Sequence, residues 1–144
     1  MTAQTTASTQ PAKLTGKQIA VNGLLAMGVA VGLNVVARFI LGALTAIPAD
    51  FPPMQVPAIV FFTVLYGIGA MAVYWLINRR ASNPQRVWLI VVVIGFVLTA
   101  LPNLAFAANP AVAPFPGTAQ LFSLLLVYHV LAGLVYFLLI PRRR

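Results

Sequence analysis

Asn34 and Arg38 are the residues whose types and spacing most need an explanation, because both lie inside a long apolar stretch, residues 19–47. Positions four apart share one face of a helix. At roughly 1.5 Å per residue, Arg38 lies about 13 Å from the C-terminal end of this stretch, residue 47. An arginine at the centre of a bilayer costs about 2.5–3.5 kcal/mol on insertion scales, and such residues face a bundle interior or a cavity. We therefore expect a polar partner for Arg38 within the protein.

Three further polar side chains lie at a similar depth in later apolar stretches. Counting residues from the same side of the membrane places all of them in one half of the bilayer. The hypothesis that follows is a single buried polar cluster inside a helical bundle. Its members are Asn34, Arg38, Thr99, Asn103 and His129.

Asp50, the only acidic residue of the chain, lies in the loop that follows the first apolar stretch. It is a candidate ion-pair partner for Arg38 if the loop folds inward. The alternative is that the long Arg38 side chain extends to the lipid headgroups and has no fixed partner in the protein.

His129 is the only histidine of the chain. We expect it to be a hydrogen-bonded interior residue, and we predict no cofactor. The alternative is an axial ligand to a tetrapyrrole. A haem with two axial histidines would need a second subunit, and bacterial light-harvesting polypeptides have a small residue four before the pigment histidine, where this chain has Leu125.

The composition argues against catalysis. Hydrolytic and transfer reactions need a nucleophile with a base, paired carboxylates or a metal. One Asp and one His, without Glu or Cys, provide few of these arrangements. We expect a protein that is not an enzyme and that has no metal site.

The elements that must position these residues are membrane helices. Hydrophobic residues make up 61% of the 144 and charged residues 7%, whereas a soluble domain has about 25% charged residues. Four stretches are long enough for the roughly 20 apolar residues that a span needs. We therefore predict an all-α, four-transmembrane-helix bundle over residues 17–144, after a disordered cytoplasmic tail at residues 1–16. The predicted spans are residues 19–47, 58–78, 87–107 and 119–140.

The distribution of basic residues predicts the topology. Eight of the nine Lys and Arg residues lie before the first span, between the second and third spans, or after the fourth. Basic loops remain in the cytoplasm, so both termini are expected there, in a multi-pass protein of the inner (plasma) membrane. The net charge of +8 therefore points to topology and anionic lipids, and not to nucleic acid.

Small residues predict where helices approach one another closely. Gly28 and Gly32 form a GxxxG pair in the first span, a pattern that lets two helix backbones approach. The predicted packing positions are Gly28, Gly32, Gly67, Gly95 and Gly133. Two functions follow: a structural or accessory subunit that packs against other membrane proteins or itself, or a small transporter, channel or ligand-binding bundle that uses the polar cluster.

The layout also resembles a bacterial family of small four-helix membrane proteins of unknown function. The matching features span residues 20–140 and include a proline-led loop after the first helix. The resemblance implies the four-span fold and no activity. The residues that carry it are Asn34, Arg38, Trp88, Pro102, His129, Ala132 and Gly133.

Overall fold

The computed structural model describes residues 13–143. Within that range the chain forms four long helices, joined by short connectors that include two 3₁₀ turns, Pro52–Met54 and Pro110–Val112. All four helices are long and apolar enough to cross a membrane, so the predicted fold class is confirmed. The helices are α1 Gly16–Leu44, α2 Val56–Arg80, α3 Pro84–Ala108 and α4 Ala119–Leu139.

Local signals explain where the helices begin. Thr15 and Gln18 form a capping box at the start of α1, which satisfies two backbone groups that would otherwise lack partners. The side chains of Asn83 and Thr118 cap α3 and α4, each by accepting one backbone N–H of the first turn. Proline occupies the first turn of α2 and α3, where its missing N–H is tolerated.

The boundary predicted for the N-terminal tail is wrong. The tail was expected to reach residue 16, but Leu14 exchanges two hydrogen bonds with the side chain of Asn78 and Thr15 already caps α1. The remainder of the predicted tail, residues 1–12, lies outside the described residues. Helix α1 also ends at Leu44, three residues before the predicted limit, because the backbone becomes extended at Thr45.

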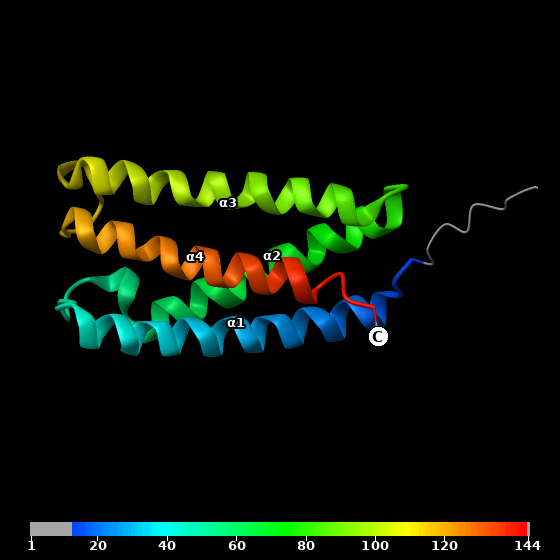
Figure 1. Cartoon of the computed structure of the whole chain (residues 1–144), viewed down its shortest axis with the longest axis horizontal. Helices are drawn as coiled ribbons and strands as arrows, with labels where there is room; N and C mark the ends of the chain where they lie inside the picture. Colours follow the sequence, from blue (N-terminus) through cyan, green and yellow to red (C-terminus); the bar gives the residue numbers. More distant parts are fainter. Residues whose placement is uncertain (1–12, 144) are drawn as a thin grey trace, which may run out of the picture.

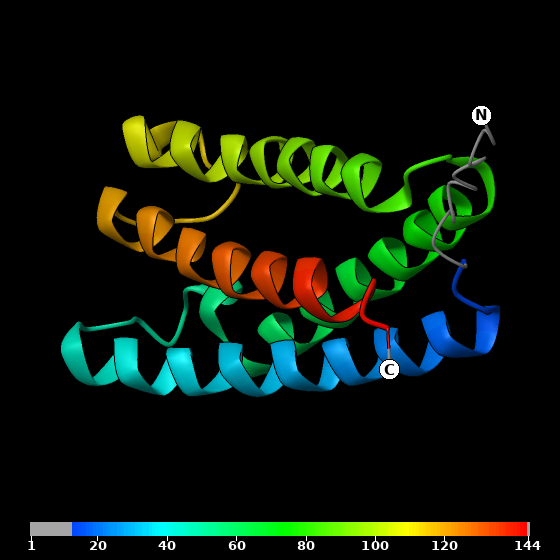
Figure 2. The same cartoon turned by 45° about the vertical axis from the view of Figure 1, so that its right-hand side comes forward.

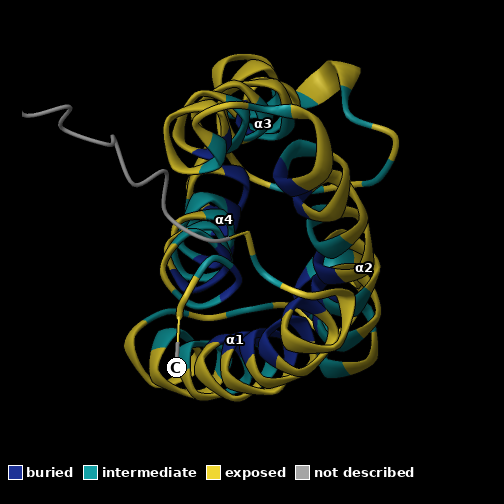
Figure 3. Ribbon diagram, turned by 90° about the vertical axis from the view of Figure 1, so that its right-hand side faces the viewer, coloured by how far each residue is buried: buried dark blue, intermediate teal, exposed yellow. Residues whose placement is uncertain are grey.

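The four helices form a ring in the order α1, α2, α3, α4, with buried residues on the inner side of the ring (Figure 3). Helices α1, α4 and α3 run side by side along the bundle (Figure 1), and α2 crosses them obliquely on its way to α3 (Figure 2). Helix α1 packs closely on α2 and α4, whereas α2 and α3 pack little on each other. Only Trp88 and Ala100 of α3 are buried.

The two ends of the bundle differ in content. The terminal end contains both ends of the described chain and the α2–α3 turn at residues 81–83 (Figure 1). The loop end contains the proline-rich connectors at residues 45–55 and 109–118. A mainly aliphatic core with Tyr74, Trp88 and Tyr136 fills the terminal end. A second core, rich in aromatic side chains, fills the loop end. Its buried members are Phe51, Met54, Ile59, Leu121, Phe122, Leu125 and Tyr128.

Only one of the five predicted packing glycines lies at a close contact between helices. A side chain at Gly67 of α2 would collide with Met27 of α1 and Tyr136 of α4. The other four make no close contact within the bundle, because a Cβ atom there would have no heavy atom of the described chain within 4 Å. These are Gly28, Gly32, Gly95 and Gly133. Gly23, which the pattern did not single out, packs under Met71 of α2.

Candidate functional site

Arg38 points toward the loop end of the bundle. Its Nε–H donates to the Met54 carbonyl oxygen at 2.6 Å, and its Nη1 lies over Gly42, one turn further along α1. A Cβ atom at position 42 would lie 2.5 Å from Nη1, so glycine provides the space for the guanidinium. The side chain as a whole is half-buried.

The first connector positions the carbonyl that Arg38 binds. Prolines at 52 and 53 begin a 3₁₀ turn, and this turn places Phe51 and Met54 inside the bundle, with 1% and 0% of their surfaces exposed. The Phe51 ring packs edge-on against Phe122 of α4 and Phe115 of the second connector. The two proline-rich connectors therefore close the loop end together.

Asn34 connects α1 to α2 through Thr63. Its Nδ2 donates to the Thr63 hydroxyl at 3.0 Å, and the Tyr136 hydroxyl of α4 donates to the Thr63 carbonyl oxygen at 2.5 Å. Asn34, Thr63 and Tyr136 are all buried. Three helices thus meet at one residue of α2, just below Arg38.

Two buried polar atoms near Arg38 make no hydrogen bond to the described part of the protein, Asn34 Oδ1 and the Tyr128 hydroxyl. Tyr128 belongs to the same loop-end core as Met54, whose carbonyl oxygen Arg38 binds. The contact between Asn22 and Ile140 sets the register of α1 against α4. Asn34 lies twelve residues after Asn22, and Tyr128 lies twelve residues before Ile140. Each interval covers about 18 Å of helix at roughly 1.5 Å per residue, so Asn34 and Tyr128 lie at the same level of the bundle.

The predicted single cluster does not form, because α3 contributes no side chain to it. The Thr99 hydroxyl donates to the Gly95 and Phe96 carbonyls, and Asn103 Nδ2 donates to the Thr99 carbonyl. These are bonds to their own helix, of the kind that short polar side chains can make four residues back along a helix. The shared depth of these residues was no guide to their position around the ring.

His129 also binds within its own helix. Its Nδ1 lies 2.9 Å from the Leu125 carbonyl oxygen, so Nδ1 carries the proton that is donated. The ring lies beside Tyr66 of α2, with 6.4 Å between ring centroids. Arg38 and His129 therefore have separate partners, and the cluster prediction is wrong for His129 as well.

Asp50 does not pair with Arg38. No ion pair joins the two residues within the described range, and Asp50 is exposed in the connector, whereas the Met54 carbonyl occupies the Arg38 Nε–H. The chain turns inward after Asp50 and not at it, because the prolines that form the 3₁₀ turn are at positions 52 and 53.

Two buried asparagines at the terminal end were missed by the sequence reasoning. Asn22 Nδ2 donates to the carbonyls of Ile140 and Arg142, at 3.2 and 2.7 Å, and so holds the end of α4 against α1. Asn78 binds the N–H and the carbonyl of Leu14. Their signal was an amide side chain close to the end of a span, which is also typical of an exposed residue.

These features define the class of the protein: a multi-pass integral membrane protein in which polar side chains join three of four apolar helices. No group of three or more His, Cys, Asp or Glu residues that could hold a metal occurs in residues 13–143. The chain belongs to a family of unknown function, DUF6069, whose model matches residues 10–144. Comparisons with curated proteins and with solved structures gave no match.

Proposed function

We propose that this protein is a non-enzymatic structural or accessory membrane protein that packs against another membrane protein or a second copy of itself. The observation that carries the proposal is the outward position of Gly28 and Gly32. Both glycines are exposed, and the space above each is open to 4 Å.

The surface around the pair supports this function. Leu24, Leu25 and Val29 of α1 are exposed beside the glycines, so the face combines two small residues with flanking apolar side chains. A GxxxG pair allows a second helix to approach closely enough for backbone-to-backbone van der Waals contact, which is the main attraction available between helices in lipid. The pair is not used inside the bundle and remains available to a partner.

The chemistry of the chain supports a role without catalysis or a cofactor. The single histidine donates to its own helix and the single acid lies in an exposed connector. A tetrapyrrole would have to bind through Nε2 of His129, next to Tyr66. Full-length protein that purifies with a visible absorption band would contradict this part of the proposal.

The second candidate is a small transporter, channel or ligand-binding bundle that uses Arg38 and His129. The first candidate is favoured because these two residues bind different partners, the Met54 carbonyl and the Leu125 carbonyl. A transported or bound ligand that is lost in both Arg38→Ala and His129→Ala would favour the second.

The test is the mass of the complex in a mild detergent. We expect an assembly heavier than the 15.4 kDa chain, which the double variant Gly28→Ile, Gly32→Ile reduces to the monomer. Gly69→Ile is the matched control, since Gly69 of α2 is also an outward glycine with no atom within 4 Å. A wild-type monomer, or equal loss of the assembly in the control, contradicts the proposal.

We also propose that the terminal end faces the cytoplasm of a plasma membrane. The basic residues of the turn and termini support this orientation. Because the chain has no cysteine, single cysteines can report it without interference. An impermeant thiol reagent should label Ala111→Cys on intact cells and leave Ser82→Cys unlabelled, and the reverse pattern contradicts the orientation.

A further inference from the structure

We propose that Arg38 and an apolar groove on α2 bind one anionic phospholipid at the loop end, with the lipid phosphate on the guanidinium and an acyl chain along α2. The inference is independent of the proposed partner face, which lies around Gly28 and Gly32.

The guanidinium has unused capacity for an anion. Arginine presents five N–H donors in a planar fork that matches the geometry of phosphate, and the Met54 carbonyl occupies one of them. The chain's only carboxylate side chain, Asp50, does not neutralise Arg38. A half-buried positive charge without an acidic partner favours an anionic ligand.

The charge lies close to the end of α1, where lipid headgroups are expected if α1 spans the membrane. Nη1 is beside Gly42, two residues before the end of α1 at Leu44. This places the guanidinium about 3 Å below the end of the helix at roughly 1.5 Å per residue, although the Cα of Arg38 is deeper. An arginine that extends to the interface in this way meets phosphate and not hydrocarbon.

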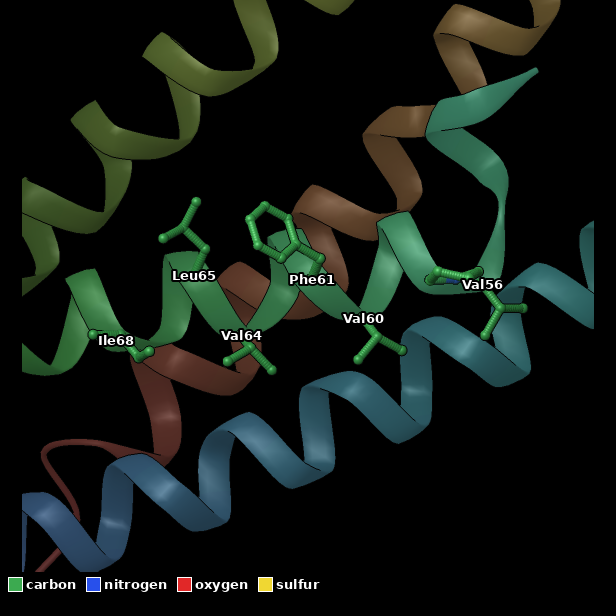
Figure 4. Close-up of a pocket in the computed structure, with 7 residues that line it drawn as sticks. Val56, Val60, Phe61, Val64, Leu65 and Ile68 are labelled. Carbon is green, nitrogen blue, oxygen red and sulfur yellow. The ribbon is translucent and has the colours of Figure 1, made fainter. Parts of the chain in front are cut away.

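An apolar groove runs along α2, and its first lining residue, Val56, follows Met54 by two residues. It has a volume of about 540 Å³ and is open to the surface. Val60 and Val64 project toward α1, and Phe61 and Leu65 project to the opposite side (Figure 4). The lining residues, all from α2, are Val56, Pro57, Val60, Phe61, Val64, Leu65 and Ile68.

The groove has the length and position that an acyl chain needs. It begins at Val56, two residues after the Met54 carbonyl that Arg38 binds, and ends at Ile68. Twelve residues of helix cover about 18 Å, close to half of a hydrocarbon core roughly 30 Å thick. A lipid with its phosphate at Arg38 would therefore extend one acyl chain through one leaflet along α2.

A free phosphate ion would bind the guanidinium as a lipid headgroup does, but it would leave the groove empty. The experiment therefore distinguishes a bound lipid from a bound phosphate ion. Full-length protein in detergent is titrated with phosphatidylglycerol and, separately, with phosphatidylcholine, and bound lipid is counted by native mass spectrometry. We expect one saturable phosphatidylglycerol. Arg38→Gln should weaken it about 10- to 100-fold, because the lipid phosphate loses its charge-assisted hydrogen bonds to the guanidinium.

Two further variants keep Arg38 and test the geometry. Gly42→Leu should displace the guanidinium and weaken phosphatidylglycerol binding about as much as Arg38→Gln does. Val60→Trp should fill the groove and weaken the lipid while leaving competition by inorganic phosphate unchanged. The matched controls are Gly69→Leu, an outward glycine of α2, and Arg86→Gln, an exposed arginine at the terminal end. Both controls should bind like the wild type.

Three outcomes would overturn the proposal: equal binding of the two lipids, an unchanged titration in Arg38→Gln, or an equal loss in the controls. Inorganic phosphate that displaces the lipid fully, with no effect of Val60→Trp, would reduce the site to an anion site without an acyl chain. If Arg38→Gln loses helicity, Gly42→Leu and Val60→Trp decide the question.

Discussion

Helices α1 and α3 both contain polar side chains in a long apolar sequence, but they use them differently. In α1, Asn22 binds the end of α4, Asn34 binds α2, and Arg38 binds the first connector. Thr99 and Asn103 of α3 bind carbonyls of their own helix. Helix α1 lies between α2 and α4, whereas α3 packs mainly on α4.

The difference shows that residue type alone does not make a polar side chain link two membrane helices. Inside lipid a polar group must form its hydrogen bonds within the protein, and the nearest available group determines which element it binds. Where another element is within reach, the side chain links two elements. Where no group of another element lies within hydrogen-bonding distance, Thr and Asn can bind the carbonyl four residues earlier, and such a bond does not link two helices.

The largest effect should come from the close contact between α1 and α2 at Gly67. Gly67→Leu forces a side chain into Met27 and Tyr136, and overpacking costs about 1–3 kcal/mol. The free energy of unfolding in mixed detergent and SDS micelles measures this loss. Gly69→Leu, on the open side of the same helix, should be neutral, and a similar loss there would mean that the contact at Gly67 is not specific.

The next effect compares one asparagine from each helix. Asn34→Ala removes the bond to Thr63 and should lower the free energy of unfolding by about 0.6–1.7 kcal/mol, the range for hydrogen bonds between membrane helices within a protein. Asn103→Ala removes only a bond within α3 and should change it by less than about 0.5 kcal/mol. Equal losses in the same unfolding assay would remove the distinction between α1 and α3.

A smaller, local effect is expected at the start of α1. Asn78→Ala removes two hydrogen bonds to Leu14, and each is worth about 1 kcal/mol or less. Hydrogen exchange at the Leu14 amide should become faster, while exchange in the middle of α1 stays slow. Unchanged exchange at Leu14 would contradict the role assigned to Asn78.

The smallest effect should come from Thr99→Val on α3. The Thr99 hydroxyl bonds only to carbonyls of its own helix, so removing it leaves no donor on another element unpaired. We expect a change below about 0.3 kcal/mol in the same unfolding assay. A loss comparable to that of Asn34→Ala would show that α3 is attached through Thr99 to a partner.

The sequence identified residues of the candidate site, but it did not predict the contacts that these residues make. Periodicity correctly placed Asn34 and Arg38 on the buried side of one helix, because the 3.6-residue repeat fixes which positions share a face. Counting residues along a helix predicts depth alone, and it does not show which side chains of neighbouring helices meet, as His129 and Asn103 illustrate. Asn22 and Asn78 were missed because the pattern does not separate a buried amide near a helix end from an exposed one.

The amino-acid sequence by itself determined that the chain is a membrane protein with four helical spans. An apolar stretch of about 20 residues can satisfy its backbone in lipid only as a helix, so composition and length suffice. The tertiary structure alone decided which helices are neighbours and that Arg38 binds the Met54 carbonyl. The path of a proline-rich connector depends on what it packs against, here Phe115 and Phe122, and no local periodicity encodes it.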